Sequence, residues 1–142
     1  MGQTSRTYID SCVLIEAWRG SDSSRIRAQK LLLDGSRTFV SSRILVLETI
    51  PKATYNKNAA EVAFYTNLIA VIQEWIPLDD VIVDLAIRLG CTHDVVGADA
   101  LHVAAALTAK VDEYVTCEKS SKPMFRVKAV NPTNIETLYP DS

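Results

Sequence analysis

The stretch VVGADALHVAAAL, residues 95–107, decides how the rest of the chain is interpreted. It is almost entirely small or apolar, with a single carboxylate, Asp99, near its front. This composition predicts a helix, and a negative charge in the first turn of a helix is favoured by the helix dipole. The dipole alone would account for Asp99, so its meaning depends on where the other acids of the chain lie.

Strands and helices are predicted to alternate outward from this helix. The predicted strands are 6–10 (RTYID), 38–42 (TFVSS), 75–78 (WIPL), 112–117 (DEYVTC) and 125–130 (FRVKAV). The predicted helices are 11–20, 23–35, 43–50, 58–75, 81–90 and 95–107. Repeated strand–helix units predict an α/β fold with a mostly parallel sheet of four to five strands and helices on both faces. No internal repeat or linker interrupts the pattern, so we expect a single domain over residues 1–142.

Several local signals set the expected helix ends. Ser11 is a good N-cap for the first helix, and Pro51 should kink or end the third. Asn58 followed by Glu61 resembles a capping box at the start of the fourth, with asparagine in place of the usual serine or threonine.

The composition excludes several classes of protein. No apolar run approaches the ~20 residues of a membrane span, and the first ten residues contain no apolar segment typical of a secretory signal. The three cysteines, Cys12, Cys91 and Cys117, form no C-x-x-C pair, which favours a reduced, cytoplasmic location. With only two histidines, a usual zinc site is not expected, and any metal would be a hard cation bound by carboxylates.

The net charge of −2 does not by itself suggest a nucleic-acid-binding protein. The distribution is uneven, however: residues 1–60 carry nine Lys/Arg against five Asp/Glu, and residues 61–142 carry six against twelve. This asymmetry leaves open either a basic face or an ordinary mixed surface.

Four acids from distant parts of the chain are predicted to meet at one edge of the sheet. Asp10 ends the first strand, Glu48 lies in the helix after the second, Asp99 begins the helix before the fourth, and Glu118 follows that strand. Ligands of open parallel sheets bind at this carboxyl edge. Because two carboxylates ~4 Å apart repel by roughly 4 kcal/mol at an effective dielectric near 20, such a cluster requires a divalent cation or bound protons.

The same residues resemble the PIN domain, and in particular the VapC-like toxins of bacterial toxin–antitoxin systems. The matching segments are YIDSCVLI, VSSRILVLETI, GADALHVAAAL and EYVTCEKSSKPMF, in the order of the family and over essentially the whole chain. The resemblance implies a three-layer α/β/α fold and a ribonuclease that depends on Mg²⁺ or Mn²⁺. It also implies a small antitoxin partner and a homodimer.

The resemblance further implies a role for each acid. Asp10 and Asp99 would be the central metal ligands, and Glu48 would bind metal or orient the attacking water. Glu118, with Thr116 before it, occupies a position where the family more often has Asp or Asn, so it would support a second ion or an outer water. In-line attack would leave a 5′-phosphate. Ser11 would bond to a metal-bound water or to one of the carboxylates.

Basic and aromatic side chains near the acids in sequence are candidates for RNA contacts. Arg43, Lys52, Lys119 and Lys122 flank the acids and are candidates for phosphate contacts, or are simply solvated charges. Trp18 and Trp75 are expected to pack on the core rather than to stack on bases.

His102 follows Asp99 by three residues on roughly the same helical face, which is where a general base would lie. The resemblance favours a structural role for it, since DALH recurs in the family without a catalytic histidine.

Two alternatives use the same residues differently. An aspartyl-phosphate phosphatase of the haloacid dehalogenase type also begins with a strand ending in aspartate, but it needs an acid two residues later, where this chain has Cys12. A non-catalytic PIN-like module for protein interaction would not need Asp10, Glu48 and Asp99 to converge. Metal-dependent hydrolysis of RNA is therefore the favoured hypothesis.

Overall fold

Five parallel strands form the centre of the molecule. The computed structural model describes residues 4–140 and has the strand order β3-β2-β1-β4-β5. The strands are β1 (Ser5–Ile9), β2 (Arg37–Ser42), β3 (Glu74–Ile76), β4 (Glu113–Thr116) and β5 (Pro132–Asn134). All four pairings are parallel. The predicted α/β architecture and the mostly parallel sheet are confirmed.

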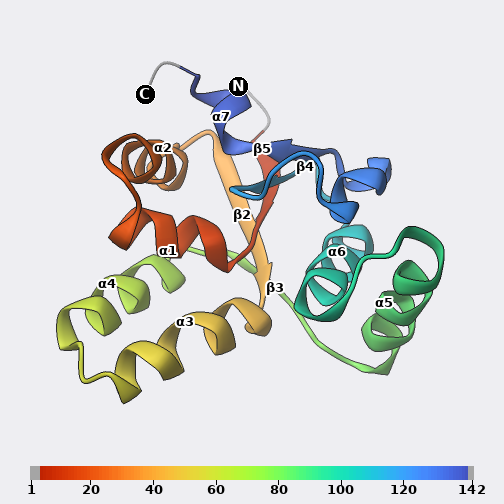
Figure 1. The fold of residues 1–142 in the computed structure, drawn as a ribbon, viewed down its shortest axis with the longest axis horizontal. Helices are drawn as coiled ribbons and strands as arrows, with labels where there is room; N and C mark the ends of the chain where they lie inside the picture. Colours follow the sequence, from red (N-terminus) through yellow and green to blue (C-terminus); the bar gives the residue numbers. More distant parts are fainter. Residues whose placement is uncertain (1–3, 141–142) are drawn as a thin grey trace.

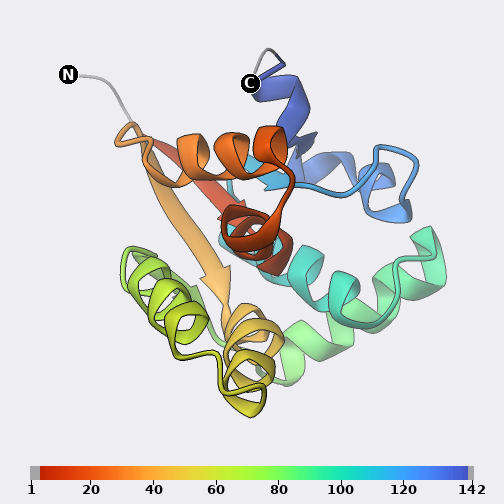
Figure 2. The same ribbon diagram turned by 60° about the vertical axis from the view of Figure 1, so that its left-hand side comes forward.

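Helices cover both faces of the sheet, which gives three layers (Figures 1 and 2). One face carries α1 (Ser11–Arg19), α2 (Asp22–Leu32), α3 (Arg43–Tyr55) and α4 (Ala59–Ile69). The other carries α5 (Asp80–His93) and α6 (Gly97–Ala109). The 3₁₀ turns η1 (Pro123–Arg126) and η2 (Lys128–Val130) and the short α7 (Ile135–Leu138) complete the fold.

The sheet separates two hydrophobic cores, and each strand contributes side chains to both, because successive side chains of a strand point to opposite faces. Tyr8 and Tyr114 face α5 and α6, whereas their neighbours Ile9 and Val115 face the helices of the other layer. With both faces covered, the buried part of the central strands contains apolar side chains together with the small hydroxyl residues Thr7, Ser41, Ser42 and Thr116. Asp10 is also buried, at 5% exposure.

Two expected strand and helix boundaries are wrong. The segment FRVKAV (125–130) forms the 3₁₀ turns η1 and η2, and the fifth strand is Pro132–Asn134. The helix expected over 58–75 ends at Ile69, because the chain must turn there to place Glu74–Ile76 beside β2. In both cases a pairing with a distant strand overrides the local apolar pattern.

The helix ends also differ from expectation. Asp10, not Ser11, is the N-cap of α1, and its side chain forms no capping bond. Pro51 lies inside α3, which continues to Tyr55. The Asn58 cap is confirmed, because its Oδ1 accepts from the Glu61 backbone N–H at 3.1 Å and its amide donates to the Glu61 carboxylate at 3.2 Å.

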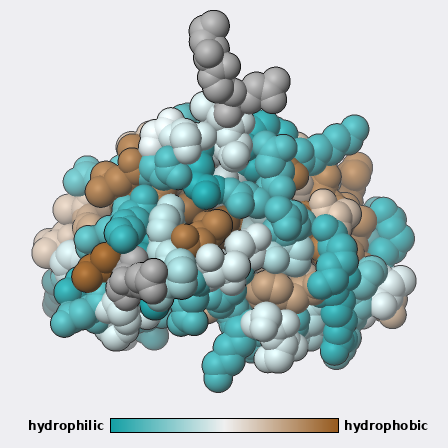
Figure 3. Space-filling model, turned by 90° about the horizontal axis from the view of Figure 1, so that it is seen from above, coloured by the Kyte–Doolittle hydropathy of each residue, from teal (hydrophilic) through white to brown (hydrophobic). Residues whose placement is uncertain are grey.

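The face seen from above in Figure 3 is mainly hydrophilic, with small and separate hydrophobic areas. Over residues 4–140, no helix is both long enough and apolar enough to cross a membrane.

Candidate active site

The carboxyl ends of β1 and β4 hold Asp10 at the point where the order of the strands reverses. The chain passes from β1 to β2 and β3 and then returns to place β4 on the other side of β1. A crevice at such a reversal is the usual ligand site of an open parallel sheet. The position of Asp10 therefore follows from the topology and not from a local motif.

Three donors fix the Asp10 carboxylate. Its Oδ2 accepts from the Tyr114 and Thr116 hydroxyls, each at 2.9 Å, and its Oδ1 accepts from the Cys12 thiol at 2.6 Å. A carboxylate offers about four lone-pair sites, so about one remains free, on Oδ1. Asp10 is thus held rigidly and keeps the capacity to bind one further positive or donating group.

The electrostatics keep two of these donors protonated. Burial raises the pKa of Tyr114 well above its usual value, and the Asp10 charge adds to the effect. The pKa of Cys12 is also raised well above its usual value, first by a hydrogen bond with Cys117, then by burial and by the Asp10 charge. Both groups therefore donate to Asp10 at neutral pH. The Cys12 thiol occupies the position where an aspartyl-phosphate phosphatase needs a carboxyl acid, which counts against that alternative.

Asp99 and Glu118 lie within electrostatic range of Asp10. Burial raises the pKa of Asp99, and the charges of Asp10 and Glu48 raise it further. Burial likewise raises the pKa of Glu118, followed by the charges of Asp99 and Asp10, while Lys122 acts against both shifts. Within residues 4–140 neither carboxylate forms an ion pair. These two acids are therefore the uncompensated part of the cluster.

Glu48 reaches the same edge from α3 but has partners of its own. Its Oε1 accepts from the His102 Nε2 at 2.8 Å, and Ser11 also forms a hydrogen bond with it. Burial raises the pKa of Glu48, but the hydrogen bond and charge of His102 and the bond from Ser11 outweigh it, so the net pKa is lowered. Glu48 is consequently kept ionised, in contrast to Asp99 and Glu118, whose pKa values are raised.

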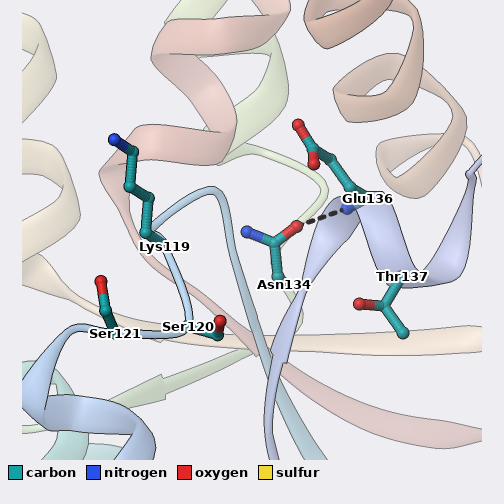
Figure 4. Close-up of a pocket in the computed structure, with 6 residues that line it drawn as sticks. All are labelled: Lys119, Ser120, Ser121, Asn134, Glu136 and Thr137. Carbon is teal, nitrogen blue, oxygen red and sulfur yellow. Dashed lines mark hydrogen bonds between the residues drawn. The ribbon is translucent and has the colours of Figure 1, made fainter.

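Two lysines, Lys119 and Lys122, follow Glu118 in the chain. Lys122 acts electrostatically on Asp99 and Glu118. Lys119 lines a polar cavity of about 540 Å³ with Ser120, Ser121, Asn134, Glu136 and Thr137 (Figure 4). The Asn134 amide in its wall donates to the Glu118 backbone carbonyl at 2.7 Å, which ties the cavity to the acidic edge. Arg43 and Lys52 are exposed on α3.

The two tryptophans differ. Trp18 packs against the core beside the Phe64 ring, with the centroids 5.1 Å apart, as expected. Trp75 is 36% exposed on the edge strand β3, so the expectation that it packs in the core is wrong. An edge strand has only one neighbouring strand, which leaves one side of Trp75 open to solvent.

The donor atoms fit a hard cation better than a soft one. The side chains are carboxylates and hydroxyls, the ligand types that Mg²⁺ and Mn²⁺ take, and the nearest thiol, Cys12, is protonated. As the side chains of residues 4–140 are placed, no three His, Cys, Asp or Glu groups are close enough to hold one metal ion. Coordination of one ion by three of these acids therefore requires side chains to move from these positions.

A model of the PIN domain matches residues 7–120, which include all four acids. The chain belongs to the PIN-domain family. No curated protein matches it by sequence.

Two of the solved structures that share this fold contain toxin–antitoxin proteins. One is VapBC2 from Rickettsia felis bound to a DNA fragment from its promoter, with a TM-score of 0.68 and 14% identity over 91% of this chain and 98% of that one. The other is a toxin–antitoxin complex from Klebsiella pneumoniae, with a TM-score of 0.67 and 18% identity over 91% and 97% of the two chains. At these identities the likeness shows the fold.

Sequence reasoning missed three side chains of this PIN domain. Cys12 and Tyr114 donate to Asp10, and Tyr8 bonds to His102. The sequence places both tyrosines in predicted strands, RTYID and EYVTC, and the structure shows that they face the α5–α6 layer. The sequence could not show their hydrogen-bond partners, because each bond joins residues about a hundred positions apart.

Proposed function

We propose that this PIN-domain protein is a metal-dependent ribonuclease of the VapC-like toxin type. One observation carries the proposal: Asp10, buried at the reversal point of the sheet, keeps about one free lone pair and lies within electrostatic range of Asp99 and Glu118, whose pKa values are raised by burial and by the charges of neighbouring acids. A divalent cation relieves that repulsion, and carboxylate oxygens are the ligands that Mg²⁺ or Mn²⁺ prefers.

Each residue has a defined part in the proposed reaction. Asp10, fixed by Cys12, Tyr114 and Thr116, supplies the preorganised oxygen for the cation, and Asp99 supplies a second one from α6. Glu48, which its lowered pKa keeps ionised, binds the cation or orients the attacking water. When bound, the cation would lower the pKa of a water molecule and stabilise charge on the phosphoryl group. Glu118 supports an outer water or a second ion.

The surroundings of the acids favour a polyanionic substrate. Lys119 and Lys122 follow Glu118 in the chain, and the cavity beside it is lined by hydroxyl and amide groups that can bond to ribose and phosphate, and by the Glu136 carboxylate, which can accept from a ribose hydroxyl. These contacts position a strand without reading its sequence. We expect an RNA cleaved to leave a 5′-phosphate, with the protein acting in the cytoplasm.

Two partners are proposed with this function. Both structural neighbours are toxin–antitoxin assemblies, which supports a small antitoxin that binds this chain. A homodimer is proposed on the family resemblance. Size-exclusion chromatography with light scattering of the chain alone, at two concentrations, tests the dimer.

Incubation with a pool of cellular RNAs tests the nuclease itself. The wild type and an Asp10→Asn/Asp99→Asn double variant are compared in Mn²⁺, Mg²⁺ or EDTA. We expect metal-dependent cleavage by the wild type only. Equal cleavage by both proteins would reject the catalytic assignment, and absence of both cleavage and Mn²⁺ binding would favour the non-catalytic interaction module.

A further inference from the structure

Four side chains beside the candidate active site form one continuous row of hydrogen bonds. The Ser42 Oγ lies 2.9 Å from the Tyr8 hydroxyl, and that hydroxyl lies 2.7 Å from the His102 Nδ1. The other ring nitrogen of His102, Nε2, lies 2.8 Å from the Glu48 Oε1. The row therefore runs from the end of β2, through β1 and α6, to the acid on α3.

Chemistry fixes the direction of the last bond. A carboxylate can only accept, so the His102 Nε2 carries hydrogen and donates to Glu48. This donation is the same whether the ring is neutral or protonated. In the neutral ring Nδ1 is an acceptor, so the Tyr8 hydroxyl donates to it and the Ser42 hydroxyl donates to Tyr8.

Burial makes the row rigid up to its last member. Tyr8 and Ser42 are fully buried and His102 is 1% exposed, whereas the Glu48 side chain is 34% exposed. The Tyr8 ring is itself held between His102 and Tyr114, with centroids 5.6 and 4.9 Å away. A glutamate on a helix surface would otherwise sample several rotamers, so the fixed donor selects one of them.

We propose that His102 is a positioning residue that holds Glu48 in its working orientation, with Tyr8 fixing the imidazole behind it. The proposal rests on the proposed nuclease function, because it gives His102 a part in that same site. It departs from a purely structural histidine in one respect: the outer nitrogen of the ring is directed to an acid of the site. Since His102 and Asp99 share α6, the same helix fixes two of the four acids.

Two substitutions of His102 separate positioning from core packing. In His102→Gln the amide nitrogen is as many bonds from the backbone as Nε2, so it can still donate to Glu48. In His102→Asn the amide matches Nδ1 instead, so it can meet Tyr8 but cannot reach Glu48. Both replacements are polar, and circular-dichroism melts establish that each variant is folded before it is tested.

Tyr8→Phe probes the inner end of the row, and Tyr65→Phe is its matched control. Tyr65 is also buried and also donates to a glutamate, Glu61, at 2.7 Å, but that bond is on α4, away from the acids. Mn²⁺ affinity, measured by titration calorimetry and by electron paramagnetic resonance, and the kcat and KM of RNA cleavage are determined for all four variants.

We expect His102→Asn to weaken Mn²⁺ binding or lower kcat by about 10- to 100-fold, as is typical for the loss of a group that orients a ligand. His102→Gln should recover most of this loss, Tyr8→Phe should show a smaller loss, and Tyr65→Phe none. KM for the RNA should stay near the wild-type value throughout.

Two other outcomes would reject the proposal, and they are distinguishable. If the wild type binds Mn²⁺ and cleaves RNA but the Gln and Asn variants behave alike, His102 is only structural and the nuclease assignment stands. If the wild type neither binds Mn²⁺ nor cleaves RNA, the nuclease function fails and the positioning role fails with it.

Discussion

The two edges of the sheet treat their acids in opposite ways. At the amino ends of the strands three acids have an arginine partner: Glu74 pairs with Arg6 at 2.6 Å, and Asp34 and Glu113 both pair with Arg37. At the carboxyl ends, Asp10, Asp99 and Glu118 form no ion pair within residues 4–140. The fold thus pairs three acids with arginines at one edge, whereas at the other edge only Glu48 has a partner, His102, among the four candidate acids.

The pKa shifts follow this division. At the amino edge the hydrogen bond from Arg6 lowers the pKa of Glu74, and bonds from Ser36, followed by Arg37, lower that of Asp34. At the carboxyl edge the pKa values of Asp99 and Glu118 are raised, by burial first and by neighbouring acids second. Carboxylates with a lowered pKa, Glu74 and Asp34, therefore stabilise the fold at the amino edge. The carboxylates with a raised pKa, Asp99 and Glu118, lie at the carboxyl edge, where we propose that the cation binds.

The largest predicted effect comes from neutralising the central acid of the carboxyl edge. Asp10→Asn should lower RNA cleavage by about 100-fold or more, as for other preorganised electrostatic groups in active sites. Glu74→Gln, the corresponding change at the amino edge, should leave the cleavage rate unchanged. Single-turnover rates on an RNA identified from the pool measure both, and a comparable loss in the two variants would contradict the contrast between the edges.

Adding the cation should stabilise the protein through the carboxyl edge alone. At a free Mn²⁺ concentration a hundred times the Kd, linkage predicts about 2.7 kcal/mol of added stability. Denaturant unfolding with Mn²⁺ or with EDTA measures the difference. Asp99→Asn should lose most of it, whereas Glu74→Gln should retain it, and a metal effect of equal size in both would place the cation elsewhere.

Removing the shared arginine of the amino edge should destabilise the fold without affecting cleavage. Arg37→Met leaves two carboxylates without their partner in a mostly buried place, which should cost about 2 kcal/mol. Arg25→Met is the matched control, because the Arg25–Asp22 pair is exposed and its loss should cost less than about 0.5 kcal/mol. Equal losses in urea unfolding would show that the ion pairs of the amino edge contribute no more than surface pairs.

The smallest effect is a gain of stability that depends on pH. The pKa of Asp99 is higher in the folded protein than its ordinary 3.8, so its negative charge disfavours the folded state at neutral pH. In EDTA, Asp99→Asn should therefore be more stable than the wild type by about 0.5 kcal/mol at pH 7 to 8, as for other relieved surface charges.

That gain should shrink as the pH falls through the raised pKa of folded Asp99, because the folded wild type then binds the proton and loses the penalty. It should vanish below 3.8, where Asp99 is protonated in both the folded and unfolded states. Thermal melts from pH 8 to pH 4 measure the difference, and a gap that widens toward low pH would contradict the sign of the shift.

The sequence predicted the alternation of strands and helices and the edge at which the acids gather. Asp10, Asp99 and Thr116 could be placed because they lie within a residue or two of strongly apolar elements, whose type the hydrophobic periodicity fixes. The weak elements were misplaced: β5 carries Pro132 and Thr133 rather than a run of apolar residues, and it exists because it pairs with β4. The family of the chain was recognisable from short motifs around the acids.

The arrangement around each acid was decided by tertiary structure. The sequence cannot show that the Cys12 thiol, the Tyr114 hydroxyl and Thr116 share one carboxylate, nor that Tyr8 and His102 lie behind Glu48. The periodicity of apolar residues determines which face of a helix or strand is buried, and this pattern can be read from a few neighbouring residues. Which donor meets which acceptor depends on strand order and register, and so on contacts between segments 54 to 106 residues apart.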